Sequence, residues 1–137
     1  MTMTGPRSIF DVAGRAMSAQ LVRMNTTASN LANAGGVAGS EAGAYRSIKP
    51  VFRTSYDQAS GLATVDVQQV VTAGPAPTRR HDPSHPLANA DGDVFDAAVD
   101  ETRELVDMME TARNYQNNVE VLQTAKSLIL DTLKLGR

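Results

Sequence analysis

The residues with most potential for chemistry are His81, Asp82 and His85, which stand close together in the sequence. Two imidazoles and a carboxylate are ligand types that zinc accepts. Pro83 and Pro86 prevent a helix that would place both imidazoles on one face, and no fourth ligand stands nearby. The pattern therefore predicts an ordinary turn without a metal ion, in which His85 packs or forms hydrogen bonds.

Other catalytic signatures do not occur in the sequence. It has no nucleophile elbow, phosphate-binding loop or dinucleotide fingerprint. It also has no cysteine, which excludes disulfides, thiolate catalysis and the usual zinc frameworks. We therefore predict no catalytic residue, no cofactor and no enzymatic activity. A small hydrolase that uses His81 or His85 is one of three functional hypotheses, and it predicts metal uptake, or loss of function when His81 or His85 is replaced by alanine.

Composition excludes several classes of partner. A net charge of −2 leaves no basic excess to neutralise phosphates, so we expect no nucleic-acid binding. No window approaches the roughly 18 consecutive apolar residues of a membrane span, so membrane insertion is not expected. Asp11 soon follows Ile9 and Phe10, which leaves no apolar region of a secretory signal, and we expect no cleaved signal peptide.

Aromatic residues make up only 4% of the chain, and tryptophan is absent. Aromatic side chains supply much of the buried area in a compact core. A solitary globule of 137 residues with this composition would be thinly filled. The composition favours a chain whose apolar stripes are covered by neighbouring chains, although a small helical bundle remains an alternative.

Residues 8 to about 34 are predicted to form the first helix. Its apolar residues recur at spacings of three and four, Ser8 and Asp11 have the form of a capping box, and Gly35-Gly36 ends it. The remaining face is mostly Ser, Thr and Asn, which are mediocre helix formers but suit a helix packed on several sides. The asparagines of this face either form hydrogen bonds between subunits or cap the end of the helix.

Residues 35 to about 93 differ in character, because they hold five of the six prolines and seven of the ten glycines. Two runs, Tyr45 to Arg53 and Ala63 to Val71, have strand character, and Ser60-Gly61 stands between them. We expect a short hairpin or small β module here. The stretch PAPTRRHDPSHP is predicted to be extended; its Arg79-Arg80 pair either lies in a solvated loop or contacts an acidic partner.

From Val94 to Leu135 there is neither proline nor glycine, which predicts a helix of about 60 Å. Acidic residues gather at its start and basic residues at its end, as the helix dipole favours. Lys126 either snorkels or sets a register. Its stripe alternates spacings of three and four, which is typical of a coiled coil: Leu105, Met108, Ala112, Tyr115, Val119, Leu122, Lys126, Ile129 and Leu133.

The predicted fold class is therefore mainly α. Long N- and C-terminal helices form a coiled-coil-like pair, with a small β-hairpin-containing middle module. The expected organisation is an N-terminal helical segment over residues 1–34, a small β/extended module over 35–93 and a long C-terminal helix over 94–137.

Three segments resemble one known family. AMSAQLVRMNTTASNLANA (16–34) is similar to the N-terminal signature of flagellar axial proteins, the bacterial rod and hook components. NYQNNVEVLQTAKSLILDTLKLGR (114–137) resembles their C-terminal helix, and DPSHPLANADGDV (82–94) resembles the turn that leads into it. Among these proteins the likeness is closest to the proximal rod, whereas residues 35–44 and 53–63 do not align with a motif.

The resemblance implies a structural role in the flagellar basal body. Terminal helices of this family pair and stack helically into a hollow tube around the export channel, which transmits torque, and a small β-rich region lies outside. Subunits leave the cytoplasm unfolded through the flagellar type III export apparatus, without a cleaved signal. In the periplasm they assemble with copies of themselves and with other rod proteins.

On this interpretation the two helix stripes and the asparagines form the subunit interface. The predicted interface residues are Phe10, Met17, Leu21, Met24, Asn25, Asn30, Leu31, Asn33, Leu105, Met108, Tyr115, Val119, Leu122, Ile129 and Leu133. The alternative is a cytoplasmic coiled-coil adaptor that dimerises through residues 100–135. A stable dimer would favour the adaptor, and a monomer with mobile ends would favour the rod.

Overall fold

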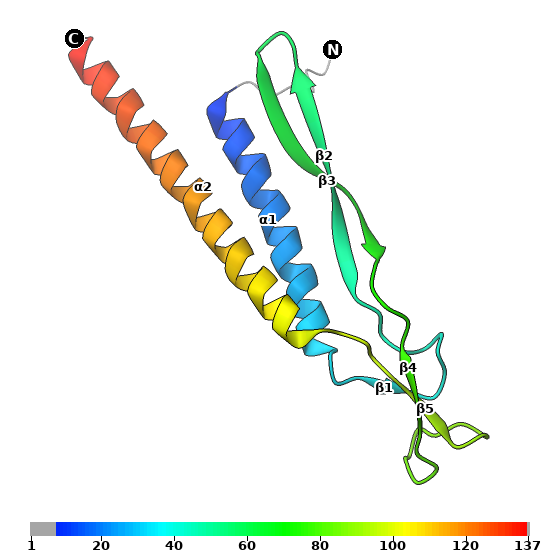
Figure 1. Ribbon diagram of the computed structural model, residues 1–137. Coiled ribbons are helices and arrows are strands. Elements are labelled where there is room, and N and C mark those ends of the chain that lie inside the picture. Colours follow the sequence, from blue (N-terminus) through cyan, green and yellow to red (C-terminus); the bar gives the residue numbers. More distant parts are fainter. Residues whose placement is uncertain (1–7, 137) are drawn as a thin grey trace.

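The computed structural model describes residues 8–136. Within this range it has a helix at each end and five strands between them (Figure 1). The elements in chain order are α1 (Ile9–Ala32), β1 (Val37–Ala38), β2 (Ile48–Asp57), β3 (Leu62–Thr72), β4 (Thr78–His81), β5 (Asp93–Asp96) and α2 (Glu101–Leu135).

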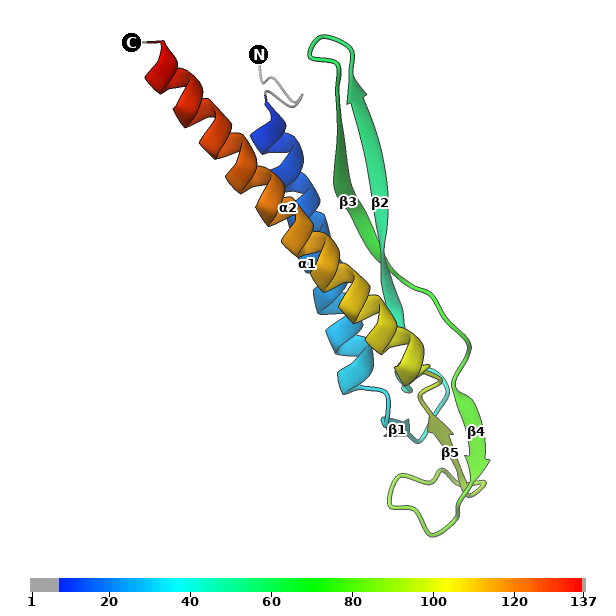
Figure 2. The ribbon, with the colours of Figure 1, turned by 60° about the vertical axis from the view of Figure 1, so that its left-hand side comes forward.

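Helix α1 lies between α2 and the β2–β3 hairpin, and it contacts both. The two helices run in opposite directions, and the C-terminal end of α2 extends beyond the beginning of α1 (Figure 2). This overhang follows from length, because α2 has 35 residues and α1 has 24. The difference corresponds to about 16 Å of helix.

Strands β2 and β3 form a long antiparallel hairpin of 10 and 11 residues, with a bulge between Val51 and Phe52. The hairpin lies alongside α1 over most of that helix. An isolated two-stranded ribbon is at best marginally stable in water. Packing against α1 therefore stabilises it.

The turn of the hairpin is held by Asp57. Its carboxylate accepts hydrogen bonds from the Ser60 hydroxyl at 2.6 Å and from the backbone N–H groups of Ala59 and Ser60 at 3.4 and 3.3 Å. The Ser60 hydroxyl is the main cause that lowers the pKa of Asp57. Gly61 completes the turn with φ of 67°, a left-handed conformation that favours glycine.

A second sheet lies at the opposite end of the molecule from the hairpin turn, with β5 between β1 and β4. All its pairings are antiparallel. Val94 of β5 is fully buried. Residues 93–96 are thus a strand, and the helix predicted from Val94 begins instead at Glu101, where the Asp100 side chain accepts a hydrogen bond from the Arg103 N–H at 3.1 Å.

The prediction of a mainly α fold based on a coiled-coil-like helix pair is wrong. The fold is mixed, because the middle of the chain forms two sheets and α1 packs on β2 and β3 as well as on α2. Because α1 packs some of its apolar residues on the hairpin and others on α2, the two helices cannot form one continuous coiled-coil interface. Consistent with this, Leu105, Ile129 and Leu133 of the predicted stripe are exposed.

The interior is small and largely polar. Among the described residues, the buried apolar side chains are Ala13, Ala19, Pro77 and Val94, whereas seven polar or charged residues are buried. Many large apolar residues are exposed, most of them on α2. The chain therefore leaves much of its apolar surface uncovered, which in soluble proteins marks interaction sites.

Candidate subunit interface

An ion-pair cluster joins the two helices. Nη2 of Arg23 in α1 lies 3.7 Å from Oδ1 of Asp107 and 3.8 Å from Oε2 of Glu110, both in α2. Partly exposed ion pairs at such distances contribute at most about 1 kcal/mol each to the free energy of unfolding. The cluster therefore sets the relative position of the helices more than it stabilises them.

The side of α2 that faces α1 is partly polar. Buried or half-buried residues recur along α2 at helical spacing, including Glu104, Met108, Thr111, Tyr115 and Leu122. Glu104 and Thr111 are the most buried of the helix. The Thr111 hydroxyl donates a hydrogen bond to the Asp107 carbonyl at 2.6 Å, which satisfies it within its own helix.

Sequence reasoning missed Glu104 and Thr111, because both are polar. It placed Leu105 and Ala112 on the stripe instead, and both of these are exposed. The seven-residue interval between Glu104 and Thr111 was visible in the sequence and could have indicated a heptad one residue earlier. The interval was overlooked because a heptad pattern is sought among apolar residues, and both of these residues are polar.

The predicted interface residues of α1 fall into three groups. Phe10 and Leu21 are exposed, whereas Met17, Met24 and Leu31 are half-buried. The three asparagines also differ in exposure. Asn25 and Asn33 are exposed, and Asn30 is only 1% exposed.

The predicted residues of α2 differ in burial according to their place along the helix. Met108, Tyr115, Val119 and Leu122 are half-buried where α2 runs beside α1. Leu105 near the start, and Ile129 and Leu133 on the overhang, are exposed. The structure thus brings together the middle of the α2 stripe and α1, and leaves its two ends open.

Asn30 fastens α1 to the start of β2. Its Oδ1 accepts hydrogen bonds from the Ile48 N–H at 2.9 Å and from the Tyr45 hydroxyl at 2.7 Å, and its Nδ2 donates to the Ile48 carbonyl at 3.0 Å. The amide therefore pairs with Ile48 as a neighbouring strand would. Ser29 adds a hydroxyl contact with Tyr45 at 3.0 Å. In the single chain this asparagine has a role within the subunit.

Asn33 stands at the end of α1. Its Nδ2 donates to the Ser29 carbonyl at 2.8 Å, and its backbone N–H bonds to the same carbonyl at 3.1 Å. This is the local capping that the sequence left open as an alternative to contact between subunits.

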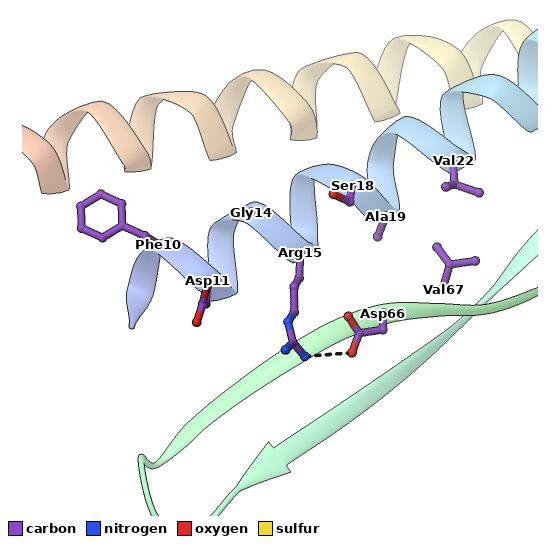
Figure 3. A pocket seen from close by; sticks show the side chains of 9 residues that line it. All are labelled: Phe10, Asp11, Gly14, Arg15, Ser18, Ala19, Val22, Asp66 and Val67. Atoms are coloured by element: carbon purple, nitrogen blue, oxygen red, sulfur yellow. Dashed lines mark hydrogen bonds and ion pairs between the residues drawn. The ribbon is translucent and has the colours of Figure 1, made fainter. Parts of the chain in front are cut away.

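A groove of about 560 Å³ lies between α1 and β3 near the start of α1 (Figure 3). Nη1 of Arg15 reaches across it to Oδ2 of Asp66 at 3.3 Å. Farther along, Val22 and Val67 lie opposite each other. Both members of the ion pair are more than a third exposed, so the pair adds little stability and mainly ties the hairpin to the helix.

A compact charge cluster occupies the small sheet. Arg80 donates hydrogen bonds to Asp96 at 2.8 and 3.3 Å and to Asp82 at 3.0 Å. The bond from Arg80 is the main cause that lowers the pKa of Asp96, and the hydroxyl of Ser84 is the main cause that lowers the pKa of Asp82. Arg80 thus contacts acidic groups of its own chain.

The histidines take part in local hydrogen bonds. Nδ1 of His81 lies 2.9 Å from Oδ1 of Asp93, so β4 and β5 are joined by side chains as well as by their backbones. Nδ1 of His85 accepts a hydrogen bond from the Leu87 N–H at 3.0 Å. Both contacts hold the turn between the two strands.

The chain is similar to known proteins in the regions of its two helices and over nearly its whole length. Residues 10–39 match the family described as flagella basal body rod protein, and residues 96–135 match the flagellar basal body rod FlgEFG protein C-terminal family. The flagellar basal-body rod protein FlgC of Yersinia enterocolitica is 45% identical over 131 residues, which cover 95% of this chain and 97% of that protein. The chain belongs to the FlgC family of flagellar basal-body rod proteins.

Other members of the FlgC family give the same result. The FlgC protein of Salmonella typhimurium is 44% identical over 132 residues and that of Escherichia coli O6:H1 is 42% identical over 130 residues, each covering 95% of this chain and 97% of its own length. The two family matches include all of α2 and all of α1 except Ile9, and the hairpin lies outside both. Neither helix in the described range is long and apolar enough to cross a membrane.

Proposed function

We propose that this chain is a structural subunit of the flagellar proximal rod, which assembles helically with copies of itself and with other rod proteins. The observation that carries the proposal is the exposed apolar surface of α2 in a member of the FlgC family. A subunit with so small an apolar interior gains stability when neighbours cover this surface.

The residues proposed to contact neighbours are the exposed members of the predicted set. On α1 these are Phe10, Leu21 and Asn25, at its C-cap Asn33, and on α2 they are Leu105, Ile129 and Leu133. The half-buried residues between the helices mainly stabilise the subunit itself, and their contact with neighbours is secondary. Asn30 contributes to the interface indirectly, because its hydrogen bonds hold β2 in position against α1.

In the assembled rod, the helices surround the export channel and the β elements lie outside, so that the tube passes torque along its axis. The three segments 1–34, 35–93 and 94–137 then correspond to two axial parts and one outer part. The subunit reaches the periplasm through the flagellar type III export apparatus without a cleaved signal. These proposals follow from family membership together with the helix–hairpin arrangement.

Deletion of the gene in its host tests the proposal. We expect loss of rod, hook and filament with the membrane base retained in purified basal bodies, and we expect restoration by a plasmid copy. Normal flagella in the deletion strain would contradict the proposal. Wild-type motility with soluble dimers of the chain in the cytoplasm would favour the adaptor instead.

A further inference from the structure

A polar hollow lies where the second half of α1, the start of β2 and the first turns of α2 meet. Its volume is about 120 Å³, several times the roughly 30 Å³ that one water molecule takes up in the liquid. Arg23 and Thr27 of α1 line it, together with Glu104 and Asp107 of α2 and residues 48–50 and 52 of β2. We name this space the Glu104 hollow.

Glu104 is the one charged residue among residues 8–136 that is buried, with only 6% of its surface exposed. Within the same range its carboxylate forms no hydrogen bond and no ion pair. A buried carboxylate loses its hydration, and without a partner this loss is not compensated. Glu104 therefore lacks the hydrogen-bond donors that its position requires.

The cations nearby do not supply those donors. Nη2 of Arg23 lies 3.7 Å from Asp107 and 3.8 Å from Glu110, so its ion pairs are with the other two acids of this region. Lys49 lines the hollow from β2, but its side chain is exposed and forms no ion pair with Glu104. Three carboxylates in and beside the hollow thus face two cations, and Glu104 is the one left over.

The walls of the hollow fit a long cationic side chain. Ile48, Pro50 and Phe52 give its β2 side an apolar lining, which suits the methylene stem of a lysine or an arginine. An ammonium or guanidinium group at the end of that stem carries donors only and matches a carboxylate. Phe52 is 39% exposed, so the β2 side is open to an approaching chain.

We propose that the Glu104 hollow receives the end of a lysine or arginine side chain from a neighbouring rod subunit. The charged group pairs with the Glu104 carboxylate, and the stem packs on the apolar residues of β2. This contact lies at the junction of the helices with the hairpin, away from the α2 overhang. The inference rests on the proposed function and assigns a chemical class to one contact of the assembled subunit.

Glu104→Gln tests the proposal, because it removes the charge and keeps the size of the side chain. In the isolated chain this substitution relieves an unpaired buried charge, so we expect a urea midpoint equal to or higher than that of wild type. In the rod it removes the partner of a buried cation, and we expect about tenfold fewer rods in complemented deletion cells. Stability and assembly therefore change in different directions.

Two variants serve as controls. Glu101→Gln makes the same chemical change at an exposed carboxylate three residues earlier on α2, and it should form rods as wild type does. Lys49→Gln tests whether the lysine of the same chain fills the hollow instead. We expect it to leave both the urea midpoint and the number of rods unchanged.

Urea titration of the purified chains and electron microscopy of basal bodies give the two measurements. Retained stability with lost rods in Glu104→Gln alone supports the proposal. Three results overturn it: Glu104→Gln that forms rods as wild type does, Glu104→Gln that lowers the urea midpoint, or Lys49→Gln that lowers it. The last two would place the partner of Glu104 within the subunit.

The same complementation assay separates this inference from the proposed function. If the wild-type plasmid fails to restore rods in the deletion strain, the proposed function fails. If wild type and Glu104→Gln restore rods equally, the contact at the Glu104 hollow is wrong and the rod function stands.

Discussion

At the scale of the residue, the Asn30 side chain joins α1 to the start of β2. It is buried and bonds to both backbone groups of Ile48 and to the Tyr45 hydroxyl. Replacing it with alanine removes three hydrogen bonds: the two to the backbone of Ile48 and the one from the Tyr45 hydroxyl, which keeps only its contact with Ser29. Because each such loss costs about 1 kcal/mol, we expect Asn30→Ala to lower the free energy of unfolding by about 3 kcal/mol in urea titrations.

The matched control is Asn25→Ala on the same helix, where the side chain is exposed. We expect a change within about 0.5 kcal/mol there. An Asn30→Ala protein as stable as the control would show that this hydrogen-bond set does not hold β2 to α1.

Arg80 offers a second test, through pH. Its guanidinium lowers the pKa of Asp96 below the ordinary 3.8. The ionised pair therefore contributes stability above pH 3.8, and this contribution is lost as the pH falls through the lower pKa of the folded protein. In Arg80→Ala we expect the Asp96 carboxyl to titrate nearer 3.8 in NMR spectra.

Arg79→Ala is the control for this titration, because Arg79 pairs with Asp93 and not with Asp96. The pKa of Asp96 should stay low in that variant. A titration of Asp96 unchanged by removal of Arg80 would contradict the assigned cause.

The sequence indicated that the asparagines of α1 were unusual, but it did not indicate their separate roles. Asn30 bonds to Ile48, which stands 18 residues farther along the chain and reaches it only because β2 folds back beside α1. No local pattern carries that information. Capping by Asn33 is local, within four residues, and it was among the alternatives.

At the scale of the element, the two ends of α2 should differ in dynamics. Residues in the middle pack on α1, whereas residues 126–136 are all exposed. Helical segments without tertiary packing are marginal in water. We expect amide protons of the overhang to exchange much faster than those around Thr111 in the monomer, and to become protected on assembly. Equal protection along the whole helix in the monomer would contradict this account.

Two aspartate substitutions distinguish packing within the subunit from packing between subunits. Leu122 is half-buried beside α1, so Leu122→Asp should destabilise the monomer by about 3 kcal/mol and also prevent assembly. Leu133 is 64% exposed, so Leu133→Asp should leave monomer stability within about 0.5 kcal/mol while still preventing assembly. Urea titration and rod formation in complemented cells are the two measurements.

Unchanged rod formation with Leu133→Asp would show that the overhang is not an interface. Unchanged rod formation with Leu122→Asp would show that packing between α1 and α2 at this position is not needed to stabilise the subunit.

Element prediction succeeded where the pattern was long. The three-and-four spacing indicated both helices, and the strand character of the run Ala63 to Val71 indicated a strand of the hairpin. The small sheet was missed, because β1 has two residues and β4 and β5 have four each, which is too short for periodicity to show. Val94, its buried residue, was assigned to the helix that follows.

At the scale of the whole molecule, the fold class differed from the prediction for a physical reason. A stripe of apolar residues shows that a helix packs on something, but it does not show whether the partner is a helix or a ribbon. Helix α1 packs on both. The open ends of α2 are consistent with a chain that completes its packing only in an assembly.

The most direct test of the account is a three-dimensional reconstruction of purified basal bodies from the host by electron cryomicroscopy. The account predicts density for this chain in the rod, with α1 and α2 in the wall around the channel, the hairpin outside, and the end of α2 covered by a neighbouring subunit. A rod without this chain, or a chain whose α2 overhang faces solvent, would contradict it.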